Sequence, residues 1–237
     1  MNLEVIERPG AEPALVFLHE GLGSVALWRE FPERLAEATG RRAIVYSRAG
    51  HGFSDVPDEP RTPRFMHEEA LEVLPGLLAE AGIERPVLVG HSDGGSIALI
   101  HASQHPVSGL VLLAPHVFVE ELSVASIEEA RQTFETTDLR ERMGRHHRDA
   151  ERTFRLWNDI WLAPEFRDWN IEDVLPRITV PILLIQGEHD QYGTLAQIEA
   201  IERAVAGPVT RAVLDSRHAP HLEAPDETLA AAVAFLD

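Results

Sequence analysis

One short segment combines a candidate nucleophile with the glycines of a tight turn. Residues 90–94 read Gly-His-Ser-Asp-Gly, after the apolar run Val87–Val89 and before a second apolar run, Ile97–Ala102. A G-x-S-x-G sequence between a strand and a helix predicts a sharp turn that displays the central serine and places the first helical N–H groups beside it. Such N–H groups can stabilise an oxyanion. We therefore predict that Ser92 is a nucleophile. The alternative is an ordinary glycine-rich turn.

The elements that must position this serine follow from short apolar runs that alternate with helical patterns. Trp28, Phe31 and Leu35 form one such helical stripe, and Gly40 follows it as a stop. The alternation predicts an α/β fold with a mostly parallel sheet buried on both faces and flanked by helices. An edge strand is expected at Leu3–Ile6, and the other predicted strands are Ala14–Leu18, Ala43–Tyr46, Pro86–Val89, Gly109–Leu113, Pro181–Ile185 and Arg211–Leu214.

The segment 117–175 interrupts the alternation. It contains no convincing strand, three of the four tryptophans and many charged residues. Ser126 to Glu129 matches a capping box and predicts a helix that begins there. We predict a helical cap over residues 117–175, inserted into a core formed by residues 1–116 and 176–237.

Two later segments complete a recognisable pattern. Gly187 to Asp190 reads G-E-H-D after an apolar run, and residues 218–225, H-A-P-H-L-E-A-P, lie near the end of the sequence. With the serine motif, these segments resemble the α/β-hydrolase family over nearly the whole chain. The resemblance implies a triad of Ser92, Asp190 and His218, with His221 as the alternative base. It departs from the family at Arg217, where glycine is usual.

A further segment of this resemblance concerns the oxyanion hole. Residues 19–24, H-E-G-L-G-S, are followed by Trp28 and resemble the H-G-x-G region of the family. The resemblance implies that the backbone N–H groups of Gly21 and Asp93 stabilise the oxyanion. Glu20 departs from the family, which usually has glycine there.

Other residues are candidates for contact with substrate. The sequence S-D-G-G at Ser92 resembles valacyclovir hydrolase, a family member, and this implies that Asp93 holds a substrate's α-ammonium group. The alternative is that Asp93 only caps the following helix. His116, just after a predicted strand, should reach the pocket. Trp157 and Trp161 either line an apolar acyl pocket or simply pack in the cap.

The resemblance implies a serine esterase that cleaves a small-molecule carboxylic ester through an acyl-enzyme. The same triad also supports C–C bond hydrolysis, thioester hydrolysis and lyase chemistry. A slow-turnover receptor that binds a small ligand on this fold is a further alternative.

Composition excludes several classes of function. The 237 residues carry a formal net charge of −18 and no cysteine. This charge disfavours nucleic-acid binding, and the absence of cysteine removes disulfides, thiolate catalysis and Cys-containing zinc sites. His101 and His105 have ligand spacing but no third ligand, so no metal and no cofactor is expected. His146 and His147 are expected on a solvated surface of the cap.

The location of the protein is predicted from what the sequence lacks. No stretch approaches the roughly 20 apolar residues of a membrane-spanning helix, and the first ten residues do not match a signal peptide. We therefore expect a cytoplasmic protein with no membrane partner. The sequence does not determine its oligomeric state.

Overall fold

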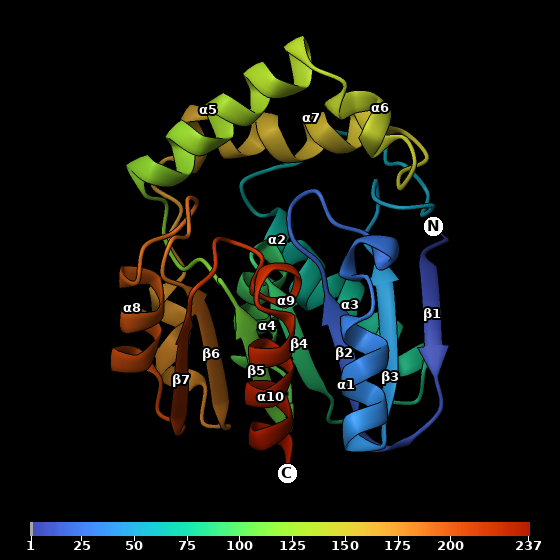
Figure 1. Cartoon of the computed structure of the whole chain (residues 1–237), viewed down its shortest axis with the longest axis vertical. Helices are drawn as coiled ribbons and strands as arrows, with labels where there is room; N and C mark the ends of the chain where they lie inside the picture. Colours follow the sequence, from blue (N-terminus) through green and yellow to red (C-terminus); the bar gives the residue numbers. More distant parts are fainter. Residues whose placement is uncertain (1) are drawn as a thin grey trace.

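A seven-stranded sheet runs through the centre of the computed structural model, which describes residues 2–237 (Figure 1). The spatial order of the strands is β1-β3-β2-β4-β5-β6-β7. All neighbouring pairs are parallel except β1 with β3, so the predicted mostly parallel α/β fold is confirmed. In chain order the strands are β1 (Glu4–Arg8), β2 (Ala11–Leu18), β3 (Arg41–Ser47), β4 (Val87–His91), β5 (Gly109–Leu113), β6 (Ile182–Gly187) and β7 (Val209–Leu214).

The central strands are buried on both faces because successive side chains point to opposite sides of the sheet. From β2, Leu15 and Phe17 pack on one side, against α1 (Phe31–Thr39) and α10 (Pro225–Leu236). Val16 of the same strand packs on the other side. The helices on that other side are α2 (Phe65–Glu68), α3 (Leu74–Glu80), α4 (Asp93–Ala102) and α8 (Ala196–Ala204), with a π-helical turn at Glu69–Val73 between α2 and α3.

Segment 117–175 lies across the carboxyl ends of the parallel strands (Figure 1). Hydrogen bonds attach it to the rest of the chain on two sides: the Ser123 hydroxyl donates to the carbonyl of Tyr192 (2.5 Å), and the Thr153 hydroxyl donates to the carbonyl of Gly50 (2.6 Å). The segment contains α5 (Glu121–Thr136), α6 (Leu139–Met143), α7 (Ala150–Trp161) and a 3₁₀ turn at Pro164–Phe166, and a second 3₁₀ turn at Glu172–Arg177 extends past its end.

The prediction that a helix begins at Ser126 is wrong. Helix α5 begins at Glu121, so Ser126 lies inside it and donates its hydroxyl to the carbonyl of Gln191 (2.5 Å). The chain enters the helix earlier because the Glu120 carboxylate accepts hydrogen bonds from Thr194 and Gln197. A local capping pattern does not contain this long-range contact.

The prediction that His147 lies on a solvated surface of the cap is also wrong. Its side chain is buried, and its Nδ1 accepts a hydrogen bond from the N–H of Gly52 (3.0 Å). Adjacent side chains point to different sides of the chain. His147 therefore faces the core below the cap, and His146 does not.

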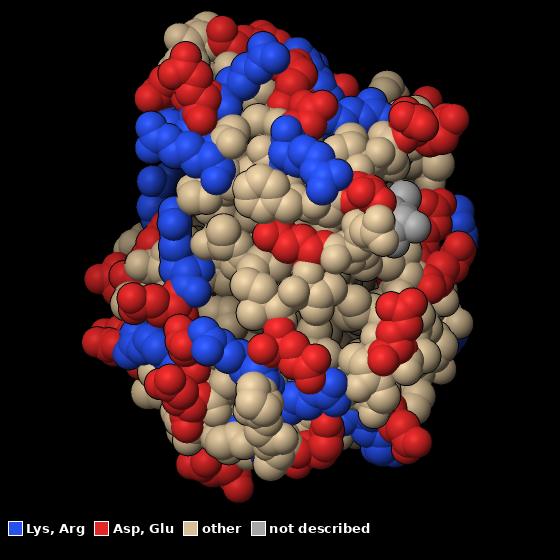
Figure 2. Space-filling model, turned by 90° about the vertical axis from the view of Figure 1, so that its right-hand side faces the viewer, with Lys and Arg blue, Asp and Glu red and all other residues tan. Residues whose placement is uncertain are grey.

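Two short helical segments lie close to the site. A 3₁₀ turn at Val25–Trp28 follows β2, and α9 (Pro220–Glu223) follows β7. Among residues 2–237, no helix combines the length and apolar character that crossing a membrane requires. On the face shown in Figure 2, acidic and basic side chains are interspersed.

The close approach of α4 to β2 gives a test of the fold. A Cβ atom at Gly94 would collide with the backbone carbonyl of Leu18, whereas Gly76, in α3, has open space around it. We expect Gly94→Ala to lower the free energy of unfolding by about 2–3 kcal/mol, because backbone must shift to relieve the overlap. The matched control, Gly76→Ala, should be neutral or stabilising by up to about 1 kcal/mol. Urea denaturation measures both, and equal stabilities for the two variants would contradict the predicted contact.

Candidate active site

Ser92 occupies a strained turn between β4 and α4. Its backbone has φ 53° and ψ −118°, a conformation that costs energy for any residue with a side chain. The turn is possible because Gly90 has no side chain: a Cβ atom there would collide with the backbone of Gly94. The N–H of Ser92 donates to the carbonyl of Leu113 on β5 (2.9 Å). The serine is therefore held at the carboxyl edge of the sheet, at the start of a helix.

Asp190 and His218 form a hydrogen-bonded pair, although they lie on different loops. The His218 Nδ1 lies 2.9 Å from Oδ1 and 2.8 Å from Oδ2 of Asp190. Asp190 comes directly after β6, and His218 lies in the loop between β7 and α9. The carboxylate is almost fully buried, while the imidazole remains partly exposed. A histidine bonded in this way has a fixed tautomer and ring orientation.

Three further donors stabilise the ionised form of Asp190. The N–H groups of Tyr192 and Gly193 donate to Oδ1 (2.8 and 3.2 Å), and the Gln186 amide donates to Oδ2 (2.7 Å). Burial alone would raise the pKa of Asp190, but its bonds with His218 and with the Tyr192 N–H hold this pKa below its usual value. Gln186 was not predicted from the sequence. Its signal is a polar residue at the end of an otherwise apolar strand.

Ser92 and His218 line the same cavity, together with cap residues. Within residues 2–237 the Ser92 hydroxyl makes no hydrogen bond with His218 in this structure. Bonds of this kind are often long before substrate binds. His221, the alternative base, does not line the cavity. It is buried against Trp28 and Phe31, and burial lowers its pKa to about 3.

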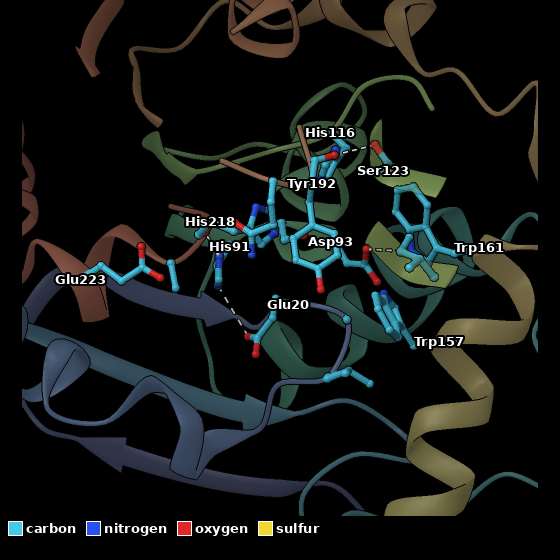
Figure 3. Close-up of a pocket in the computed structure, with 16 residues that line it drawn as sticks. Glu20, His91, Asp93, His116, Ser123, Trp157, Trp161, Tyr192, His218 and Glu223 are labelled. Carbon is cyan, nitrogen blue, oxygen red and sulfur yellow. Dashed lines mark hydrogen bonds and ion pairs between the residues drawn. The ribbon is translucent and has the colours of Figure 1, made fainter. Parts of the chain in front are cut away.

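The cavity has a volume of about 250 Å³ and lies between the sheet edge and the cap (Figure 3). Trp157 and Trp161 of α7 line one side of it. His116 also lines it, with its ring 5.6 Å from that of His218, and burial lowers the pKa of His116 to about 3. The cavity is therefore lined by aromatic rings and neutral imidazole beside the serine.

Within residues 2–237, the backbone N–H groups of Gly21 and Asp93 make no hydrogen bond outside the helical and strand ladders. These are the residues predicted to stabilise an oxyanion. Both residues line the cavity with Ser92. The lack of a side chain at Gly21 also lets the cap pack closely, because a Cβ atom at this position would collide with the indole of Trp157.

Asp93 is the first residue of α4, where negative charge is favoured, and no side-chain capping hydrogen bond is made at this helix start within residues 2–237. Its Oδ1 accepts a hydrogen bond (3.2 Å) from the indole of Trp161, a residue of the cap helix α7 (Figure 3). Its Oδ2 lies 3.7 Å from the guanidinium of Arg48, and both side chains are buried. Burial raises the pKa of Asp93, and Arg48 opposes part of that effect. Sequence spacing did not suggest Arg48, which is 45 positions away in the chain.

Metal-ligating side chains do not gather in the part of the chain that the structure describes. No group of three or more His, Asp or Glu side chains that could hold an ion is found in residues 2–237. The rings of His101 and His105 stack 4.6 Å apart, and the Nδ1 of His101 bonds to the carbonyl of Ala70.

Comparison with known proteins agrees with this architecture. Residues 15–232 match the model of the alpha/beta hydrolase family. The chain is 33% identical over 106 residues to the sn-1-specific diacylglycerol lipase ABHD11 of Mus musculus, which covers 45% of this chain but only 33% of that relative. It is 24% identical to the proline iminopeptidase of Lactobacillus helveticus, covering 98% of this chain and 92% of the relative.

Solved structures show the same fold. The enol-lactonase of Burkholderia xenovorans LB400 superposes with a TM-score of 0.77 at 24% identity, covering 99% of this chain and 96% of that one. The family match spans most of the sheet, the turn at Ser92 and the loops of Asp190 and His218. The chain therefore belongs to the alpha/beta hydrolase family and is a hydrolase.

Proposed function

We propose that the protein cleaves small carboxylic esters through an acyl-enzyme, with Ser92 as nucleophile, His218 as general base and Asp190 as the residue that orients the base. One observation carries this proposal: the Asp190–His218 pair opens onto the cavity in which the strained turn presents Ser92. The mouse relative is named as a lipase, a type of ester hydrolase, and this supports the choice of bond.

The mechanism follows from the hydrogen bonds of the pair. With Nδ1 bound to Asp190, the Nε2 of His218 is free to take the proton of the Ser92 hydroxyl as the oxygen attacks the substrate carbonyl. The imidazolium then protonates the leaving alcohol, and Asp190 stabilises its charge. Water cleaves the acyl-enzyme by the same proton transfers in the second half of the reaction.

The N–H groups of Gly21 and Asp93 would stabilise the oxyanion formed in both halves. Their availability supports this role, because a donor already bonded within the protein would have to break that bond first. Each donor is expected to contribute about 3 kcal/mol to transition-state stabilisation.

Segment 117–175 acts in this proposal as the cap domain of a core formed by residues 1–116 and 176–237. Its residues Ser123, Ile127, Trp157 and Trp161 line the cavity, so the cap sets the shape available to substrate. A volume of about 250 Å³ suits a short acyl chain, and it is below the range typical of drug-sized ligands. We assign contact with the acyl group to His116, Trp157 and Trp161.

A test of the triad uses short-chain p-nitrophenyl esters. We expect Ser92→Ala to abolish turnover and Asp190→Asn to lower kcat by about 10⁴-fold, since the second change removes the charge that holds His218 in the required tautomer. Circular dichroism and urea denaturation should show that both variants remain folded. Activity of folded Ser92→Ala close to that of the wild type would contradict an acyl-enzyme on this serine.

The charge of the cavity gives a prediction for substrate choice. Within residues 2–237, Glu20, Asp93 and Glu223 line it, and no lysine or arginine does so. We expect p-nitrophenyl butyrate to have a kcat/KM at least about tenfold above that of mono-p-nitrophenyl succinate, because no lysine or arginine of the lining compensates for the loss of water around the succinate carboxylate. An equal kcat/KM for the two esters at low salt would contradict this expectation.

A second candidate activity is hydrolysis of amino-acid esters. The Oδ2 atom of Asp93 is buried and makes no hydrogen bond within residues 2–237, so it lacks a donor of the kind that an α-ammonium group would supply. The proline iminopeptidase relatives, as their name states, act on peptides. We rank this candidate second because Arg48 already lies beside the carboxylate.

Asp93→Asn distinguishes the two candidates. If Asp93 holds an ammonium group, the variant should lose about tenfold or more in kcat/KM on an alanine ester but not on the matched propionate ester, because a charge-assisted hydrogen bond is lost only in the first case. Equal rates on the two esters, unchanged in the variant, would leave simple esters as the substrates.

A further inference from the structure

A chain of polar contacts joins the end of β4 to two loops of the proposed site. The His91 Nε2, at the end of β4, donates to the carbonyl of His218 (2.8 Å). On its other side, the His91 Nδ1 lies 3.6 Å from the carboxylate of Glu20, in the loop that carries Gly21 (Figure 3). His91 itself is buried. One side chain therefore contacts both the loop of the proposed base and the loop of the proposed oxyanion hole.

Glu20 is an unfavourable residue for this place unless its charge is balanced. It directly precedes Gly21, and it lines the same cavity as Ser92. Its carboxylate occupies the space beside Gly23, where a Cβ atom would collide with it. A carboxylate so close to a developing oxyanion opposes the build-up of negative charge in the transition state.

The groups around His91 favour its protonated form. Burial alone would lower the pKa of His91, but the Glu20 carboxylate, the carbonyl of His218 and the charge of Asp190 together raise it above its usual value. Burial likewise opposes the ionisation of Glu20, yet the contact with His91 lowers the pKa of Glu20 to about 2. The other titratable rings that face His91 are His218 and His221, and His221 is neutral because its pKa is about 3.

We propose that His91 is a positioning residue of the hydrolase site that does two things: protonated, it neutralises Glu20 beside the oxyanion hole, and through Nε2 it holds the backbone of His218. The proposal rests on the proposed function of the site. The two roles are separable, because a neutral side chain with a donor at the place of Nε2 still holds the His218 carbonyl but cannot neutralise Glu20.

A double-mutant cycle tests the neutralising role. His91→Gln keeps an amide donor toward the His218 carbonyl and leaves Glu20 unbalanced. We expect it to lower kcat by about 10- to 100-fold with little change in KM. The double variant Glu20→Gln/His91→Gln should recover most of that loss, because the charge that needed balancing is gone. His105→Gln, outside the cavity, is the matched control for a histidine-to-glutamine change.

The pH profile gives a second readout that a merely structural role would not move. A group with a raised pKa is charged below that pKa and loses its charge as pH rises through it. In the wild type kcat/KM should therefore fall on the alkaline side as His91 loses its proton, whereas the double variant should lack this fall. A wild-type profile that stays flat on the alkaline side would overturn the proposal.

NMR titration of the His91 imidazole tests the pair without any substrate. The pKa of His91 should be lower in Glu20→Gln than in the wild type, and the signal is assigned by its absence in His91→Gln. If the wild type hydrolyses no ester, the proposed function is contradicted. The double-mutant cycle can then be measured from the rates at which a fluorophosphonate probe labels Ser92 in each variant. The proposal is overturned if the double variant is no better than His91→Gln, or if Glu20→Gln leaves the His91 pKa unchanged.

Discussion

The close contact between α4 and the carboxyl ends of β2 and β4 is the constraint on which the rest of the site depends. Gly90 and Gly94 permit it, since a Cβ atom at either position would overlap backbone. The contact places Ser92 in an unfavourable backbone conformation, and the packed helix and sheet on both sides supply the free energy that holds it there. Because β4 is central in the sheet, residues from the loops that follow β2, β5, β6 and β7 line the same cavity as this serine.

The loop of Asp190 connects the sheet to the cap as well as to His218. Its residues Gln191 and Tyr192 accept hydrogen bonds from serine hydroxyls of α5, while the Tyr192 N–H donates to the Asp190 carboxylate. One loop therefore contacts both the cap and the proposed base.

Charge balance is the other organising feature of the site. Buried carboxylates are costly unless a cation or several donors accompany them. Asp190 has His218 and three donors, Asp93 has Arg48 and the Trp161 indole, and Glu20 has His91. The proposed nucleophile is thus surrounded by carboxylates whose charges are balanced within the protein, which leaves the cavity open to neutral substrates.

Local sequence determined much of this protein. The apolar runs and their alternation were sufficient for the strands and the fold class, because burial on both faces of a parallel sheet leaves a short-range pattern. The motif at Ser92 predicted a strand–turn–helix that the structure contains, because glycines are required where backbones nearly touch.

Only the tertiary structure decided the contacts between distant segments. These include the start of α5 through Glu120 and Thr194, the burial of His147 against the loop of Gly52, and the pairing of Asp93 with Arg48. Such contacts join positions tens of residues apart, and they leave no periodic or local signal because each depends on how the cap and loops pack over the sheet.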